Sequence, residues 1–143
     1  MLKNIDPLLN PDVLYALQAM GHGDSLAIVD ANFPAHSKAA KRVISLPGNT
    51  ASDTLKAVLT VLPLDQFEQF PIKTMRQIDS DTPPEAALNF TYIIDKSEES
   101  NHKSEPIERQ RFYELVEKCQ LVISTSDLRP YACLILTKGV IFG

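Results

Sequence analysis

The chain has 143 residues, of which 44% are hydrophobic and 22% are charged, and its formal net charge is -4 at pH 7. This length predicts one domain that can bury a real core. The mild negative charge, with lysines and arginines scattered along the chain, argues against binding of nucleic acid, which needs a basic face. No apolar run approaches the ~20 residues of a membrane span, so a membrane is not an expected partner either.

The N-terminus and the cysteines indicate the compartment. The opening MLKNIDPLLN carries proline, asparagine and aspartate where a signal peptide would have its apolar region, so a cytoplasmic protein is expected. The two cysteines, Cys119 and Cys133, then read as reduced thiols of the core. They are too few for a zinc cage and neither lies in a CxxC motif, so no metal is expected.

The first predicted element is a helix over residues 11–20. Asn10 can cap it, and Pro11 suits the first helical position. Gly21 is predicted to end the helix, because glycine adopts the left-handed C-terminal conformation without strain. The apolar face at helical spacing consists of Val13, Leu14, Leu17 and Met20.

The middle of the chain alternates between predicted strands and helices. SLAIVD, residues 25–30, is too short an apolar run for a helix and is followed by a turn signal, so it predicts a buried strand. RVISL predicts a second strand and PIKTMRQID a third. Between them, residues 50–65 predict a helix capped near Ser52, with its apolar stripe made by Leu55, Val58, Leu59 and Leu62.

The C-terminal half continues the alternation. PPEAALNFTYIID predicts a helix that starts at Pro84, and residues 95–106 predict a charged, solvated loop with His102 at the surface. ERQRFYELVEKC predicts a helix with Phe112, Leu115, Val116 and Cys119 facing inward, and LVIST and CLILTKGVIF predict the last two strands. The pattern predicts a single α/β domain over residues 1–143, with a mixed or mainly parallel sheet flanked by helices. Such sheets bind ligands beyond the carboxyl ends of their strands, where Asp30 lies.

His22 stands between two glycines, in a turn that precedes the strand ending at Asp30. Glycine on both sides permits a tight turn and leaves the imidazole unobstructed. The spacing alone favours an ordinary helix end at Gly21 followed by a loop histidine. A metal site built from His22, Asp24, Asp30 and His36 is a third interpretation, although the spacing matches no standard ligand pattern. A six-residue strand spans ~20 Å, so the sequence leaves open whether His22 and Asp30 meet in one subunit.

Several stretches resemble one known family. MGHGDSLAIVDANFPAHS, with LLNPDVLYAL upstream, resembles the N-terminal signature of the L-fucose mutarotase and D-ribose pyranase family. ERQRFYELVEKCQLVISTSD and RPYACLILTKGVI resemble its C-terminal helix and strands. The resemblance runs nearly end to end and is weakest from Arg76 to Glu105. The NFPAHS wording, and Arg109 four residues before Tyr113, place the chain nearer the fucose mutarotase branch.

The resemblance implies roles for individual residues. His22 matches the family's catalytic histidine, Asp30 a sugar-binding aspartate and Arg109 a sugar-binding arginine. Tyr131 matches the first residue of a Tyr-Gly-Asn sugar-binding motif. The resemblance also implies a ring-shaped homo-oligomer with active sites at subunit interfaces, and a reaction that needs no cofactor.

The motif at Tyr131 departs from the family pattern. It reads Tyr131, Ala132 and Cys133, so that a thiol stands in place of the asparagine amide. A thiol donates and accepts hydrogen bonds only weakly. These three residues remain the expected sugar contacts of the motif, and the change bears on which sugar is bound.

The implied function is an isomerase that interconverts the α and β anomers of a free monosaccharide, most naturally L-fucose. Histidine suits such acid/base ring opening, because its ordinary pKa of ~6.5 leaves both protonation states available near neutrality. Tyr131 is the candidate partner of His22 in proton transfer. Asp24 either orients His22 or caps loop amides, and His36 either lines the pocket or faces solvent. The alternatives are a pyranase acting on ribose or a related sugar, and a non-catalytic sugar-binding protein that serves uptake.

Overall fold

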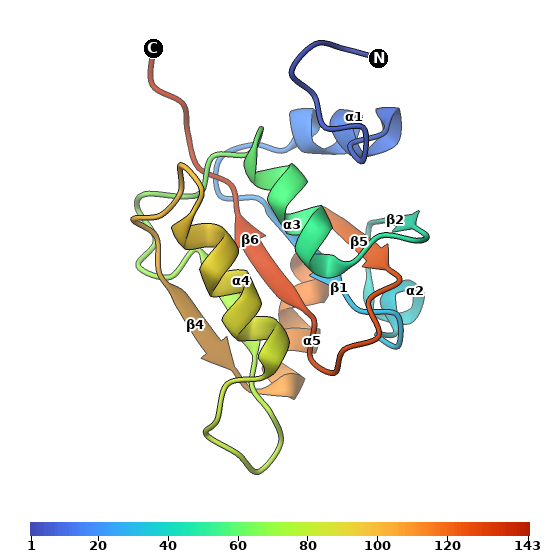
Figure 1. The fold of residues 1–143 in the computed structure, drawn as a ribbon, viewed down its shortest axis with the longest axis vertical. Helices are drawn as coiled ribbons and strands as arrows, with labels where there is room; N and C mark the ends of the chain where they lie inside the picture. The colour runs from blue at the N-terminus through green and yellow to red at the C-terminus, as the bar shows by residue number, and fades with distance from the viewer.

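A six-stranded mixed sheet organises the chain in the computed structural model, which describes residues 1–143 (Figure 1). The strand order is β2-β5-β1-β6-β3-β4. The strands are β1 Ser25–Val29, β2 Arg42–Leu46, β3 Ile72–Met75, β4 Ser104–Ile107, β5 Leu121–Thr125 and β6 Leu134–Thr137. The helices are α1 Pro11–Ala19, α2 Ala35–Lys38, α3 Ala51–Leu59, α4 Glu85–Asp95 and α5 Arg109–Lys118.

The strand directions decide which side chains meet at each edge of the sheet. β1 pairs in parallel with β5, which pairs in parallel with β2, and β3 and β4 are also parallel. β6 is antiparallel to both of its neighbours, β1 and β3. The sheet is therefore mixed, as the sequence predicts. Because β1 and β5 run the same way, Asp30 and Asp127 follow their carboxyl ends at the same edge.

Helices cover both faces of the sheet, so the domain has three layers. Alternate residues of β1 point to opposite faces. Leu26 and Ile28 join a core with residues of α1, α3 and α4, while Ala27 and Val29 join a second core with residues of α2 and α5. Figure 1 shows α3 and α4 on one side of β6 and α5 on the other. No helix combines the length and the apolar character that spanning a membrane would require.

Two predicted helix ends differ from the structure. Asn10 caps α1 as predicted, since its side chain accepts a hydrogen bond from the N–H of Val13. Gly21, however, does not take the left-handed conformation, because the chain leaves α1 extended at Met20, and the positive φ of 84° occurs at Gly23. The cap of α3 is Thr50 rather than Ser52.

Two C-terminal predictions also need correction. The predicted loop ends early, because Ser104–Ile107 pairs with β3 at the sheet edge. The His102 imidazole is only 9% exposed and pairs with Glu99 at 3.0 Å, so it is not a surface side chain. The last strand stops at Thr137, and Lys138 then forms an isolated bridge with Leu64.

Both cysteines are free and buried, as predicted for thiols of the core. Cys119 packs on the α5 side of the sheet. Burial raises the pKa of its thiol to about 11, so it is protonated at neutral pH. The helix that carries it, α5, also buries Phe112 and Val116 as predicted, whereas Leu115 is only half-buried.

Candidate functional site

The residues singled out from the sequence fall into two groups at opposite ends of the sheet. His22 precedes β1, and Asp30 follows it directly. A strand rises ~3.3 Å per residue, so the five residues of β1 separate the two groups by roughly 15 Å or more. His22 is not among the residues that line the hollow next to Asp30. One copy of the chain therefore carries two half-sites, which are named here the His22 end and the Asp30 end.

The Asp30 end is a hollow of about 340 Å³. Besides Asp30, it contains the predicted sugar-binding residues Arg109, Tyr131 and Cys133. The end of β1, the start of α5 and the loop before β6 meet there. Its lining consists of Asp30, Asn32, Phe33, Pro34, Met75, Arg109, Tyr113, Leu128, Arg129, Pro130, Tyr131 and Cys133. The hollow mixes an acid, two guanidinium groups, phenol hydroxyls and apolar walls, a set suited to a small polyhydroxylated ligand.

Asp30 is held in a fixed orientation. The whole residue is buried, with 9% of its surface exposed. One carboxylate oxygen accepts the N–H of Asn32 at 3.0 Å, and the other accepts the thiol of Cys133 at 3.3 Å. Burial, followed by the neighbouring charge of Asp30, raises the pKa of the Cys133 thiol well above its ordinary value, so the thiol remains a donor. Each oxygen keeps lone-pair capacity for a further donor.

Arg109 and Tyr131 reach this hollow from different elements. Arg109 is the first residue of α5, and its guanidinium carbon lies 5.9 Å from the centre of the Tyr113 ring. Tyr131 has a positive φ of 59°, and its hydroxyl accepts the backbone N–H of Ile78 at 3.3 Å. Ala132 is fully buried in the core and does not line the hollow, so its side chain is not available to a ligand there.

An ion pair between a buried carboxylate and a partly exposed arginine anchors the loop that carries Tyr131, and sequence reasoning missed it. The guanidinium of Arg129 donates to both carboxylate oxygens of Asp127, at 3.0 and 2.7 Å. Burial raises the pKa of Asp127, but the hydrogen bonds from Arg129 and from backbone amides outweigh it and hold the pKa below its ordinary value. Arg129 also donates to Asn89 of α4 and to Ser52 of α3. The loop is thereby fixed to two helices.

The His22 end is built around a histidine–carboxylate pair. His22 Nε2 lies 3.0 Å from Asp65 Oδ1. The imidazole is 45% exposed and the carboxylate 9%. Burial raises the pKa of Asp65, but hydrogen bonds from His22 and from the backbone N–H of Phe67 lower it further, leaving the pKa below its ordinary value. A carboxylate only accepts, so Nε2 carries the hydrogen and Nδ1 remains free to exchange a proton.

The C-terminal segment holds the two parts of this pair together. The N–H of Gly23, next to His22, donates to the carbonyl of Lys138 at 2.9 Å. The N–H of Asp65 donates to the carbonyl of Thr137 at 3.0 Å. The end of β6 and the residue that follows it therefore bond to both the histidine loop and the aspartate segment. This backbone frame fixes the distance between His22 and Asp65.

Asp24 and His36, for which the sequence leaves two alternatives each, lie outside the His22–Asp65 pair and the Asp30 hollow. Asp24 accepts the backbone N–H of Gly21 at 2.8 Å, as a residue that caps loop amides does, and it is not the carboxylate bonded to His22. Asp65 takes that place, 43 residues further along the chain, where no local pattern signals it. His36 is exposed on α2 and lines none of the larger hollows. His22, Asp24, Asp30 and His36 do not gather into a metal-binding group.

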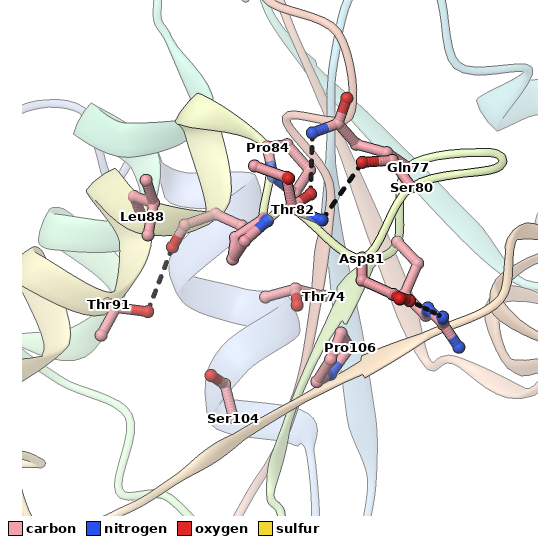
Figure 2. Close-up of a pocket in the computed structure, with 13 residues that line it drawn as sticks. Thr74, Gln77, Ser80, Asp81, Thr82, Pro84, Leu88, Thr91, Ser104 and Pro106 are labelled. Atoms are coloured by element: carbon pink, nitrogen blue, oxygen red, sulfur yellow. Dashed lines mark hydrogen bonds and ion pairs between the residues drawn. The ribbon is translucent and has the colours of Figure 1, made fainter.

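A separate hollow of about 270 Å³ lies between β3, β4 and the start of α4. Its polar groups bond mainly to one another, as Figure 2 shows for Gln77 with Thr82, Thr82 with Ser80, and Asp81 with an arginine. None of the catalytic or sugar-binding residues predicted from the sequence lines this hollow. It therefore adds nothing to the candidate chemistry.

Comparisons with known proteins find relatives that are similar over the whole chain. The L-fucose mutarotase of Actinobacillus pleuropneumoniae serotype 5b is 36% identical over 141 residues, which cover 98% of this chain and 97% of the relative. The fucose mutarotase from Streptococcus pneumoniae, solved in complex with L-fucose, superposes with a TM-score of 0.88 at 31% identity, covering 99% of this chain and 100% of that one. Bacillus subtilis RbsD complexed with D-ribose gives a TM-score of 0.77 at 26% identity, covering 99% and 100%.

Of these two structures, the fucose mutarotase has the higher TM-score and sequence identity to this chain, as the NFPAHS stretch predicts. The family model of the RbsD / FucU transport protein family matches residues 3–141. The resemblance read from the sequence is therefore confirmed over nearly the whole length. The chain belongs to the RbsD / FucU transport protein family.

Proposed function

We propose that this protein is a mutarotase, an isomerase that interconverts the α and β anomers of a free monosaccharide, with L-fucose as the first substrate to test. The observation that carries the proposal is the pairing of a half-exposed His22 with a buried, ionised Asp65. The relative from A. pleuropneumoniae is named an L-fucose mutarotase, and the S. pneumoniae enzyme was solved with L-fucose. Both support this substrate class.

The chemistry needs only positioned proton donors and acceptors. The ring of a reducing sugar opens when the anomeric hydroxyl loses a proton and the ring oxygen gains one. The carbonyl carbon then turns, and the ring closes on its other face. With Asp65 on Nε2, His22 uses Nδ1 to take or return the proton. Tyr131, whose hydroxyl accepts from Ile78, keeps its own proton to donate to the sugar.

The sugar is held by the Asp30 end. Asp30 accepts hydrogen bonds from sugar hydroxyls, and Arg109 offers a planar set of donors to hydroxyl or ring oxygens. Cys133 occupies one oxygen of Asp30 and leaves the rest of the carboxylate to the ligand. No step of this reaction calls for a cofactor or a metal ion.

The two half-sites complete one another only between copies of the chain. β1 separates His22 from Asp30 within a copy, so we propose that His22 of one copy faces the Asp30 hollow of the next. Exposed apolar side chains stand at both ends: Phe142 at the His22 end, two residues after the Val140 that bonds to Gln66, and Ile78 and Leu128 at the Asp30 end. A head-to-tail contact of this kind closes into a ring when its rotation allows, which is the assembly that the family resemblance implies.

Anomer exchange measured by NMR tests the reaction. The wild-type protein is expected to accelerate α/β interconversion of L-fucose, and His22→Ala is expected to remove most of the acceleration while the circular dichroism spectrum stays unchanged. Equal rates for the variant and the wild type would show that His22 is not the catalyst. Exchange measured in parallel on D-ribose, L-rhamnose and D-galactose identifies the preferred sugar.

Mixing two inactive variants tests the shared site. His22→Ala and Asp30→Ala are dissociated, combined in equal amounts and reassembled. If each site takes His22 from one copy and Asp30 from another, about one quarter of the sites regain both residues, and activity returns to about that level. If the site lies within one copy, the mixture stays as inactive as its components.

Two alternative functions predict different results in these exchange measurements. A pyranase acting on ribose is favoured by the likeness to RbsD complexed with D-ribose, and it predicts faster exchange with ribose than with fucose. A non-catalytic sugar-binding protein is favoured by the thiol of Cys133 at the sugar-binding carboxylate. It predicts binding of a sugar with no effect on anomer exchange.

A further inference from the structure

An exposed aromatic ring accompanies the imidazole of His22. The ring centres of Phe67 and His22 are 5.6 Å apart, and the two planes are inclined by 56°. The Phe67 residue is 71% exposed. Beside a proposed catalytic group, this exposed ring offers an apolar surface that a bound sugar can cover.

The carboxylate of Asp65 helps to position both the His22 and the Phe67 ring. Asp65 Oδ1 accepts the hydrogen bond of His22 Nε2 at 3.0 Å and that of the Phe67 backbone N–H at 3.2 Å. Gln66, which lies between Asp65 and Phe67 in the chain, donates its side-chain amide N–H to the carbonyl of Val140 at 3.1 Å. The turn at residues 65–67 is therefore fixed at both its aspartate and its glutamine. The position of the Phe67 ring follows from the turn that orients His22.

We propose that Phe67 is a substrate-contacting residue that enters the sugar site together with His22. This inference rests on the proposed function. The Asp30 end supplies carboxylate and guanidinium groups for the sugar hydroxyls, whereas Phe67 supplies an apolar surface for the C–H face of the same sugar. L-Fucose carries a methyl group and so presents more apolar surface to such a ring than L-galactose, which differs from it by a hydroxyl on that carbon.

The contact with Phe67 has a kinetic signature of its own. Packing of a ring against the sugar is present in both the bound substrate and the transition state, so its loss raises KM and leaves kcat nearly unchanged. Loss of His22 or Asp65, by contrast, lowers kcat. The ratio of kcat/KM for L-fucose over L-galactose also falls when the ring is removed.

Three variants test the proposal by anomer-exchange NMR over a range of L-fucose and L-galactose concentrations. Phe67→Leu keeps apolar volume for a contact between copies but removes the flat ring, and Phe67→Tyr restores the ring. Tyr92→Ala, an aromatic residue of α4 that is 62% exposed and lines neither half-site, is the matched control. For Phe67→Leu we expect KM for L-fucose to rise about tenfold, with kcat within about threefold of wild type.

Phe67→Tyr and Tyr92→Ala are expected to keep the wild-type KM, and light scattering is expected to give all three variants the wild-type mass. An unchanged KM in Phe67→Leu, or an equal rise in Tyr92→Ala, overturns the proposal. A change of mass in Phe67→Leu also overturns it and assigns the ring to packing between copies. A wild-type protein that does not accelerate exchange overturns the proposed function itself. If the wild type is active and Phe67→Leu has the same KM, only the proposed role of Phe67 is overturned.

Discussion

His22 Nε2 and Asp65 Oδ1 are 3.0 Å apart although 43 residues separate them in the chain. Backbone hydrogen bonds hold Asp65 to Thr137, the last residue of β6, and Gly23, next to His22, to Lys138, so the pairing is part of the fold. The pair converts a surface histidine into one with a fixed tautomer and a free Nδ1.

Asp65→Asn is expected to lower kcat for anomer exchange by about a hundredfold while the protein stays folded. An amide can present either a donor or an acceptor to His22, so the tautomer with the free Nδ1 is no longer enforced. The control is Asp24→Asn, which removes the carboxylate that caps Gly21 and leaves the pair intact. Equal losses in both variants would mean that the loop, and not the pairing, supports activity.

Gly139→Ala is expected to destabilise the protein by about 2 kcal/mol in urea unfolding. A Cβ at this position would lie 2.3 Å from the carbonyl oxygen of Leu64, which belongs to the backbone and cannot swing away. The strain pushes the segment that carries Asp65 away from His22, so exchange activity falls as well. Gly143→Ala meets nothing within 4 Å and is expected to match the wild type.

Tyr131→Gly is expected to be more stable than Tyr131→Ala by about 1 kcal/mol, measured by the midpoint of chemical denaturation. Both variants lose the phenol, so their difference isolates the backbone at φ 59°. A positive φ carries no steric penalty for glycine, whereas alanine is strained there. Equal stabilities would indicate that residue 131 relaxes out of the left-handed region once the tyrosine is gone.

The pair of Asp127 and Arg129 is expected to give stability that is lost in acid. The pKa of Asp127 in the folded protein lies below its ordinary value of 3.8, so near that pH the unfolded chain binds a proton that the folded chain does not. Falling pH therefore favours unfolding. At pH 7 we expect Asp127→Asn to cost about 2–3 kcal/mol, and the cost to shrink as the pH falls below about 5.

Urea unfolding at a series of pH values measures this difference. Asp81→Asn is the control, because the Asp81 carboxylate is 99% exposed in its pair with Arg76 and surface pairs contribute little. Its difference from wild type is expected to be small at every pH. A loss in Asp127→Asn that does not change with pH would show that the carboxylate stabilises the protein through its shape and hydrogen bonds alone.

The sequence alone determined most of the fold. Hydrophobic periodicity and capping residues act over a few neighbouring residues, so α1, β1, β2, α4, α5 and β5 are predicted close to their observed limits. The alternation of these elements also determined the α/β class. The end of α3 at Leu59 and the short β6 are less well predicted, because Leu64 and Lys138 pair with each other across the molecule.

The candidate site divides in the same way. Resemblance to a family pointed to His22, Asp30, Arg109 and Tyr131, and the structure places the last three around one hollow. Only the tertiary structure decided that Asp65, and not the nearby Asp24, pairs with His22, and that Arg129 locks the loop before Tyr131. These contacts join residues that are distant in the chain or face different helices, and their geometry depends on how the strands assemble. A local pattern reports only on the residues that share its own helix, strand or turn.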